Sequence, residues 1–262
     1  MQSGYWQDRT TVDFARVDPE QTVAVLPVAA IEQHGPHLPL STDAVINQGI
    51  VRAMLGRLAG SQSVLVLPPL DVGHSPEHAS FPGTLAVSSA TLATVWTDVG
   101  RSVARAGVRK LVIFNTHGGQ KSLVDLVAVR LRAELGMLVV RATYFSFGAP
   151  SRLFDTDELV HDIHGGEVET SLMLHLAPQL VRMSEAADFR GLPHELAERN
   201  RLLGAEKPIG IGWLSRDLHP AGVVGNAARA DAGRGARHLS YLAERFTALL
   251  AEVAATPLSI LK

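Results

Sequence analysis

Histidine is the residue type that could carry chemistry in this sequence, because its 262 residues include 11 histidines and no cysteine. Seven of the histidines fall in four short stretches rich in glycine or proline, and two of these stretches directly follow a predicted strand. In open α/β sheets, the loops that leave the carboxyl ends of the strands line the ligand crevice. We therefore expect the four stretches to contribute to one site. Their histidines are His34 and His37, His74 and His78, His117, and His161 and His164.

The stretch IEQHGPHLPLSTD (31–43) offers two carboxylates and an imidazole as metal ligands. Glu32 and His34 are two residues apart, so an extended chain points both side chains to the same face. Asp43 follows at the start of a predicted helix, where it could also serve only to stabilise that helix end. Oxygen and nitrogen donors without sulfur suit Zn²⁺, Mn²⁺ or Fe²⁺. A carboxylate can also bridge two such ions, which then generate and share a hydroxide nucleophile.

The stretch FNTHGG places His117 just after a predicted buried strand, and Gly118 and Gly119 open the next helix. Two glycines allow a tight turn from strand to helix and leave backbone N–H groups accessible to a ligand. A plain tight turn, or an anion-binding loop without a metal, would produce the same pattern.

The stretch HDIHGGEVETS (161–171) brings further histidines and carboxylates in front of the predicted helix TSLMLHLA. Acidic residues near a helix N-terminus often only stabilise the helix. Glu167 and Glu169 cannot face the same way on a helix, so at least one of them is expected to have that structural role.

Strands and helices alternate along the chain, and this alternation would bring the stretches together. We expect strands at 22–29, 64–67, 110–114 and 137–143, helices at about 43–58, 89–106, 120–135 and 234–253, and a loop-rich region at 184–232. Such alternation is typical of βαβ units and of a largely parallel sheet covered on both faces. The sequence therefore predicts one α/β domain over residues 1–262.

Composition excludes several classes of function. The 24 basic and 26 acidic residues give a net charge of −2, which lacks the basic footprint of a nucleic-acid binder. The absence of cysteine excludes disulfides, thiolate metal sites and cysteine nucleophiles. No apolar run reaches the 18 or more residues of a membrane span, and the N-terminus lacks the apolar core of a secretory signal. We expect a cytoplasmic protein that binds neither nucleic acid nor membrane.

Five stretches, taken in order, resemble the creatininase (creatinine amidohydrolase) family along most of the chain. The resemblance implies a three-layer α/β/α fold with a mostly parallel central sheet, a centre of two divalent metal ions, and hydrolysis of a C–N amide bond. Members often assemble as hexamers, so it also implies a homo-oligomer. The stretches are EQHGPHLPLSTD (32–43), HSPEHASFPGT (74–84), NTHGGQ (115–120), HGGEVETS (164–171) and, more weakly, GVVGNAARADAGRG (222–235).

The resemblance also implies roles for single residues. Asp43 is similar to the bridging carboxylate, and His164 is similar to the histidine beside the scissile bond. The other metal ligands that it implies are Glu32, His34 and His117. In enzymes that open creatinine, that last histidine is followed by an aromatic residue and a metal-binding glutamate, which are Gly118 and Gly119 here. We expect Glu169 to replace the missing ligand from the opposite side.

We therefore predict a metal-dependent amidohydrolase that holds two divalent ions, with Zn²⁺ favoured over Mn²⁺ or Fe²⁺. Metal-bound hydroxide would attack the amide, His164 would carry a proton to the leaving nitrogen, and His78 would orient or stabilise the substrate. Gly118 and Gly119 would contribute backbone N–H donors. The expected substrate is a small cyclic amide or a formamide, and not creatinine, since residues 144–165 lack the tryptophans that hold its ring.

Three alternatives remain open at this point. One is a peptidase that trims a modified precursor peptide, as one branch of the family does. The second is a metal-binding member of the family without catalysis. The third is a phosphate- or nucleotide-binding domain that uses NTHGG as an anion cradle, although the chain lacks the usual glycine-rich phosphate-binding strings.

Overall fold

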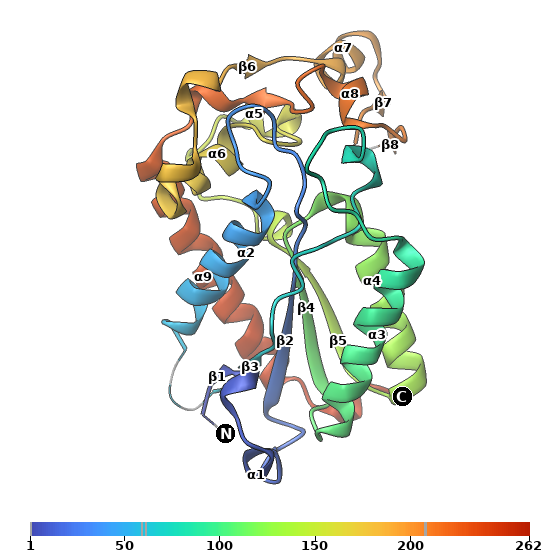
Figure 1. Cartoon of the computed structure of the whole chain (residues 1–262). Coiled ribbons are helices and arrows are strands. Elements are labelled where there is room, and N and C mark those ends of the chain that lie inside the picture. The colour runs from blue at the N-terminus through green and yellow to red at the C-terminus, as the bar shows by residue number, and fades with distance from the viewer. Residues whose placement is uncertain (1, 59, 61, 207–208) are drawn as a thin grey trace.

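A five-stranded parallel sheet lies at the centre of the computed structural model, which describes residues 2–58, 60, 62–206 and 209–262 (Figure 1). Its strand order is β1-β3-β2-β4-β5, and each neighbouring pair is parallel. Since helices cover both faces of the sheet, the predicted three-layer α/β/α fold is confirmed. The strands are β1 (Gly4–Tyr5), β2 (Thr22–Val28), β3 (Ser63–Val66), β4 (Lys110–Asn115) and β5 (Leu138–Thr143).

Two groups of helices form the outer layers. Helices α2 (Thr42–Leu55), α6 (Glu167–Leu176) and α9 (Ala232–Ala255) pack on one face, and α3 (Ser89–Arg105) and α4 (Lys121–Leu135) pack on the other. The predicted helices agree with α2, α3, α4 and α9 to within a few residues. Across residues 2–58, 60, 62–206 and 209–262, we find no helix that is both long and apolar enough to cross a membrane.

The helix α6 begins three residues earlier than the sequence pattern predicts. The Asp162 carboxylate accepts a hydrogen bond from the backbone N–H of Val168 at 2.9 Å and thereby satisfies a donor of the first turn. As a result, Glu167 and Glu169 both lie within the helix rather than before it.

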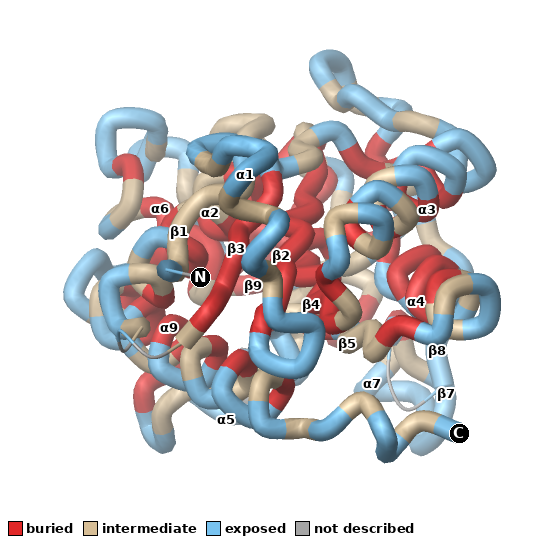
Figure 2. Tube along the Cα trace, turned by 90° about the horizontal axis from the view of Figure 1, so that it is seen from below, coloured by how far each residue is buried: buried red, intermediate tan, exposed pale blue. Residues whose placement is uncertain are grey.

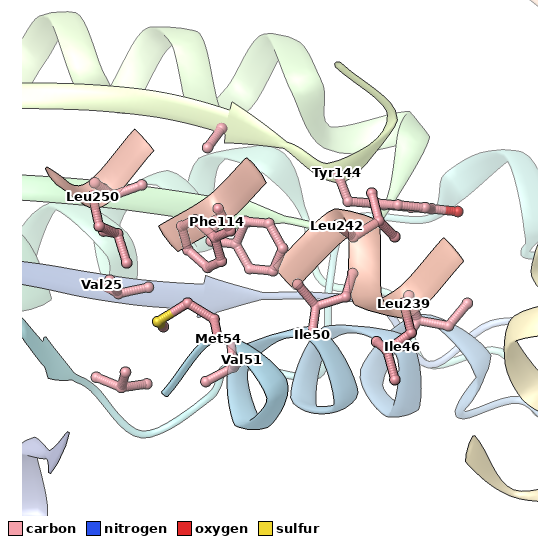
Figure 3. Packing of buried hydrophobic residues seen from close by; sticks show 14 of the residues in the cluster. Val25, Ile46, Ile50, Val51, Met54, Phe114, Tyr144, Leu239, Leu242 and Leu250 are labelled. Atoms are coloured by element: carbon pink, nitrogen blue, oxygen red, sulfur yellow. The ribbon is translucent and has the colours of Figure 1, made fainter. Parts of the chain in front are cut away.

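The central strand β2 supplies side chains to both cores by simple alternation. Val23 and Val25 face the layer of α2 and α9, whereas Ala24 and Leu26 face the layer of α3 and α4. Figure 2 shows the central strands as buried, with exposed residues around them. In the first core, side chains of α2 and α9 meet over the sheet around Phe114 (Figure 3). A sheet packed on both faces is a rigid platform for the loops at its carboxyl edge.

The remaining segments gather mainly beyond that carboxyl edge, at the top of Figure 1. There, β6 (Asp188–Phe189) pairs antiparallel with β9 (Gly225–Asn226), and β7 (Leu203–Gly204) pairs with β8 (Ile209–Gly210). The short helices α5 (Thr156–His161), α7 (Leu192–Arg199) and α8 (Ser215–Leu218) lie in the same region, while α1 (Thr11–Phe14) lies at the opposite end. We refer to residues 144–166 and 178–226 as the cap. The 3₁₀ helices span Trp6–Asp8, Pro76–His78, Gly118–Gln120, Tyr144–Phe147, Pro178–Leu180, Met183–Glu185, Ala227–Arg229 and Leu258–Ile260.

Candidate metal centre and active site

Five of the predicted site residues meet at the carboxyl ends of β2 and β4. The loop after β2 carries two of them, the start of α2 carries the third, the residue pair after β4 carries the fourth, and α6 carries the fifth. All five side chains are buried, with at most 5% of each residue exposed. They are Glu32, His34, Asp43, His117 and Glu169.

Asp43 lies between the two histidines, and each of its carboxylate oxygens faces a different ring. Its Oδ1 is 3.4 Å from Nε2 of His34, and its Oδ2 is 3.5 Å from Nδ1 of His117. Oε1 of Glu32 lies 3.1 Å from Nδ1 of His117. Oε2 of Glu169 lies 3.8 Å from Nε2 of His34. Asp43 therefore lies next to both histidines, and His34, Asp43 and Glu169 are close enough together to hold one ion. Two ligands of one tetrahedral ion, each at about 2.1 Å, would lie roughly 3.4 Å apart.

The backbone determines which ring nitrogen of each histidine faces Asp43. His34 Nδ1 is 3.0 Å from the carbonyl oxygen of Glu32, and His117 Nε2 is 3.0 Å from that of His74. A carbonyl oxygen can only accept, so each of these nitrogens carries a proton. When the rings are neutral, Nε2 of His34 and Nδ1 of His117 therefore carry lone pairs, and these lone pairs face Asp43. This outer-shell hydrogen bonding is the arrangement found around metal-binding histidines.

The electrostatics of the cluster demand positive charge. Burial by itself would lower the pKa of His34, but Asp43, Glu169 and Glu32 raise it to about 9. Burial likewise opposes charge on His117, yet its carboxylate neighbours hold its pKa well above the ordinary value. Burial would raise the pKa of Asp43, but the attraction of His117 and His34 in their protonated forms holds it below its ordinary range. Either protons or metal ions must therefore balance the carboxylates.

Several donor atoms of the cluster are left without a hydrogen bond. Among the described residues, none forms a hydrogen bond with Glu32 Oε2, His34 Nε2 or Asp43 Oδ2, although all three atoms are buried. Buried polar atoms are normally satisfied, so exceptions of this kind require an explanation. The set contains only oxygen and nitrogen donors, which fits divalent ions such as Zn²⁺ or Mn²⁺.

Two more predicted residues, His164 and His78, face the cluster from the cap side and from the loop that follows β3. The ring of His164 is 4.2 Å from that of His34 and 4.3 Å from that of His78, measured between centroids. His164 Nδ1 lies 3.9 Å, and His78 Nε2 lies 3.4 Å, from Oε1 of Glu32. Burial, followed by the nearby His34, lowers the pKa of His164, and burial is also the main cause that lowers the pKa of His78. Both rings are therefore neutral near neutral pH.

A cavity of about 920 Å³ opens from the cluster toward the cap. It is lined by Gly118 and Gly119, and also by apolar residues of the cap that are at least 37% exposed. These apolar residues, which we call the cavity rim, are Phe145, Leu159, Val160, Leu202, Leu203 and Ile211.

Glu77 is a cavity residue that the sequence reasoning missed. Its Oε1 is 3.3 Å from His117 Nε2, and a Cβ atom added to Gly119 would lie only 1.8 Å from that oxygen. The Glu77 carboxylate thus occupies the space that any larger residue at position 119 would need. Glu32, Glu77 and His117 also lie close enough together to share an ion. One feature of the sequence could have indicated a role for Glu77: it is the only acidic residue in the stretch 74–84, which also carries His74 and His78.

The other histidines lie farther from the five ligand candidates or face other groups. His37 is within hydrogen-bond distance of Thr170, and His74 is within hydrogen-bond distance of the Val87 carbonyl. His161 lines the cavity, and its ring lies 4.4 Å from that of His194 in a tilted arrangement. His175 is exposed, and His238 is buried within the packing of α9.

Comparison with known proteins gives a consistent result. The sequence model described as "Creatininase: Creatinine amidohydrolase" matches residues 7–250. A "Mycofactocin precursor peptide peptidase" of Mycobacterium ulcerans (strain Agy99) is 32% identical over 218 residues, covering 81% of this chain and 78% of the relative. The "Creatinine amidohydrolase" of Pseudomonas putida is 34% identical over 190 residues, covering 66% of this chain and 72% of the relative.

Solved structures agree with this match. Two creatininases, one described as a Mn form and one as a Zn-Zn type of a mutant, each give a TM-score of 0.75 at 25% identity. Each comparison covers 96% of this chain and 98% of the other. Both metals are thus associated with creatininases of this fold.

Proposed function

The chain belongs to the creatininase family of hydrolases, and from this premise we propose that it hydrolyses an amide C–N bond with the help of two divalent metal ions. The observation that carries the proposal is the position of Asp43, whose two oxygens face the lone pairs of His34 and His117. One ion would be held by Glu32, Asp43 and His117. The other would be held by His34, Asp43 and Glu169.

The ions would supply Lewis acidity, which polarises an amide oxygen and makes a water molecule acidic near neutral pH. The protein has to supply proton transfer and orientation. The Nδ1 atom of His164 is suited to accept a proton from water and to return it to the leaving nitrogen. His78 and the N–H groups of Gly118 and Gly119 would orient the amide. Both histidines are buried, which limits the access of bulk water to them.

A peptide-like amide is the substrate class that we propose first. Sites that enclose drug-sized ligands usually measure about 300–1,000 Å³, so a cavity of about 920 Å³ is large for a single small ring. The exposed apolar cavity rim would contact side chains that flank a scissile bond. The match to mycofactocin precursor peptide peptidases supports the same choice.

A small cyclic amide or a formamide is the second candidate. The match to the creatinine amidohydrolase of Pseudomonas putida favours it. Creatinine itself fits less well, since residues 144–165 contain no tryptophan to hold its ring. A metal-binding protein without catalysis would keep the cluster but would not need the neutral His164. Assembly into a homo-oligomer remains a prediction, which light scattering in solution would test.

The test begins with metal analysis of the purified protein by mass spectrometry. We expect about two equivalents of Zn²⁺, Mn²⁺ or Fe²⁺ in the wild-type protein and none in Asp43→Ala, because a shared ligand serves both ions. His164→Ala should keep the ions and lower turnover by about 10²–10⁴-fold, which is typical for loss of a general acid–base group. Wild-type protein that stays below one equivalent after reconstitution would contradict the two-metal proposal.

The substrate class is tested with a panel of oligopeptides with apolar residues at either end, small cyclic amides and formamides. Turnover of peptides alone would support the first candidate, and turnover of small amides alone would support the second. No turnover in the whole panel by metal-loaded protein would favour the non-catalytic alternative.

A further inference from the structure

Gln33 stands between the metal-ligand candidates Glu32 and His34, and nothing above gives it a role. Only 5% of the residue is exposed. Its amide side chain contacts His78, and its main chain contacts His164. One residue therefore touches both of the neutral histidines that face the cavity.

The orientation of the Gln33 amide follows from its backbone partners. The N–H of Gly35 can only donate, and it lies 3.0 Å from Oε1 of Gln33. The carbonyl of Gly222 can only accept, and it lies 2.7 Å from Nε2. With the amide fixed in this way, the second hydrogen of Nε2 points toward Nδ1 of His78 at 2.8 Å.

Because the amide donates to Nδ1 of His78, this nitrogen is the acceptor and the ring proton is on Nε2. The hydroxyl of Ser215 is 3.0 Å from the same Nδ1 and also donates to the Glu77 carbonyl, and a hydroxyl proton can rotate between the two acceptors. Nε2–H of His78 then faces the carboxylate oxygens of Glu32 at 3.4 Å and Glu77 at 3.9 Å.

The main chain of Gln33 fixes the same tautomer in His164, but there the lone pair and not the N–H faces the carboxylates. Nε2 of His164 lies 2.7 Å from the Gln33 carbonyl oxygen, so Nε2 carries the proton and Nδ1 is a lone pair. This Nδ1 is the atom that faces Oε1 of Glu32 at 3.9 Å. The two rings, 4.3 Å apart, therefore present different groups to the same place: a donor from His78 and an acceptor from His164.

We propose that Gln33 is a positioning residue that fixes which nitrogen of His78 and of His164 carries the proton. The rest of this inference depends on the proposed function. His78 then donates a hydrogen bond to the amide oxygen as charge develops on it. His164 accepts the proton from water as the O–C bond forms, and passes it to nitrogen as the C–N bond breaks. With the other tautomer, His78 would present a lone pair to the carboxylates and could not stabilise the oxygen.

The direct test is nuclear magnetic resonance of Zn²⁺-loaded protein labelled with ¹⁵N at its histidine rings. The ¹⁵N shifts of each ring show which nitrogen is protonated, and spectra of His78→Asn and His164→Asn assign the two rings. We expect Nε2–H on both rings of the wild-type protein. Nδ1–H on His78 would overturn the proposal whether or not the protein is active.

The Gln33→Glu variant tests the cause, because a carboxylate accepts from Nδ1 and should move the proton of His78 to that nitrogen. We expect this change in the spectrum, unchanged metal content, and a kcat about 10²-fold lower, comparable to the loss of one oxyanion donor. Gln48→Met is the matched control, since Gln48 contacts Asp71 away from the cavity, and its spectrum and kcat should equal those of the wild type. If Gln33→Glu does not fold, Gln33→Met, which has no donor, should give a mixture of both His78 tautomers.

The outcomes separate this inference from the proposed function. The expected tautomers in a protein that hydrolyses no amide would support the positioning role and count against the proposed function. A fold-competent Gln33→Glu or Gln33→Met whose His78 tautomer equals that of the wild type would overturn the positioning role while leaving amide hydrolysis intact.

Discussion

At the scale of single residues, Glu167 and Glu169 lie two positions apart in α6 but have different partners. Residues two apart on a helix point about 200° away from each other. Glu167 forms ion pairs with Arg234 and, at 3.7 Å, with Arg229. Glu169 instead accepts from the N–H of Gly165 at 2.7 Å and from the hydroxyl of Tyr144 at 3.2 Å, and it faces His34. The geometry therefore favours Glu169 as the metal ligand and Glu167 as a structural carboxylate.

This difference predicts opposite phenotypes for the two isosteric variants. Glu169→Gln should lower the metal content from two equivalents to about one, because a neutral amide is a poor ligand, and leave the ion at Glu32, Asp43 and His117. Glu167→Gln, the matched control, should keep both ions but unfold more easily, by about 1–3 kcal/mol, since Arg234 loses a charged partner. Metal analysis and urea unfolding measure the two effects. Two ions in Glu169→Gln would show that another group is the ligand.

The metal-ligand candidates could be found from the sequence because residue type, spacing and family resemblance agree for them. Glu32 and His34 are two residues apart after a strand, and Asp43 begins a helix. Glu77 and Gln33 could not be found in this way. Their roles depend on which atoms of the loops at 31–35 and 74–84 meet in space, and neither spacing nor periodicity carries that information.

At the scale of elements, the long strands and helices were predictable and the cap was not. Helix α9 has a regular apolar stripe and an N-cap at Asp231, whose side chain accepts from the N–H of Arg234 at 2.8 Å. The cap consists of strands of two residues and short helices, and its pairs join distant segments, such as Asp188 with Asn226. Such short elements show no periodicity.

The close approach of α9 to α6 could also not be predicted from the hydrophobic periodicity. It depends on Gly235, because a Cβ atom at that position would lie 1.9 Å from the Ser171 carbonyl oxygen.

Helix α9 also predicts a pH dependence of stability through His238, which is buried with its ring at the edge of Phe154. Burial lowers the pKa of His238 to about 4, whereas an unfolded histidine has a pKa of about 6.5. Between these values the unfolded chain binds one more proton than the folded chain, so stability decreases as the pH falls from 6.5 to 4. The contribution of this group is on the order of 3 kcal/mol.

Urea unfolding at pH 7 and at pH 4.5 measures this effect. The loss of stability between the two pH values should be smaller in His238→Leu than in the wild type. The exposed His175→Gln variant is the control and should show the wild-type loss. An equal loss in His238→Leu would mean that other groups account for the acid sensitivity.

At the scale of the whole molecule, the metal cluster joins elements that are far apart in the chain. Glu32 and His34 follow β2, His117 follows β4, and Glu169 belongs to α6. The chain carries a net charge of only −2, yet several carboxylates are buried at this one place. Without positive ions, their mutual repulsion opposes folding, so ion binding and global stability must be linked.

Removal of the ions by a chelator should therefore lower the melting temperature, and addition of Zn²⁺ or Mn²⁺ should restore it. A site filled at 100 times its Kd stabilises the native state by about 2.7 kcal/mol, which corresponds to roughly 5–10 °C for a chain of this size. Asp43→Ala provides the control, because it removes the shared ligand. Its melting temperature should not exceed that of the chelated wild type, since His34 and His117 lose their carboxylate partner, and it should not respond to metal. If metal raises the melting temperature of both proteins equally, the ions bind elsewhere, and the cluster at Asp43 is stabilised by protons on His34 and His117.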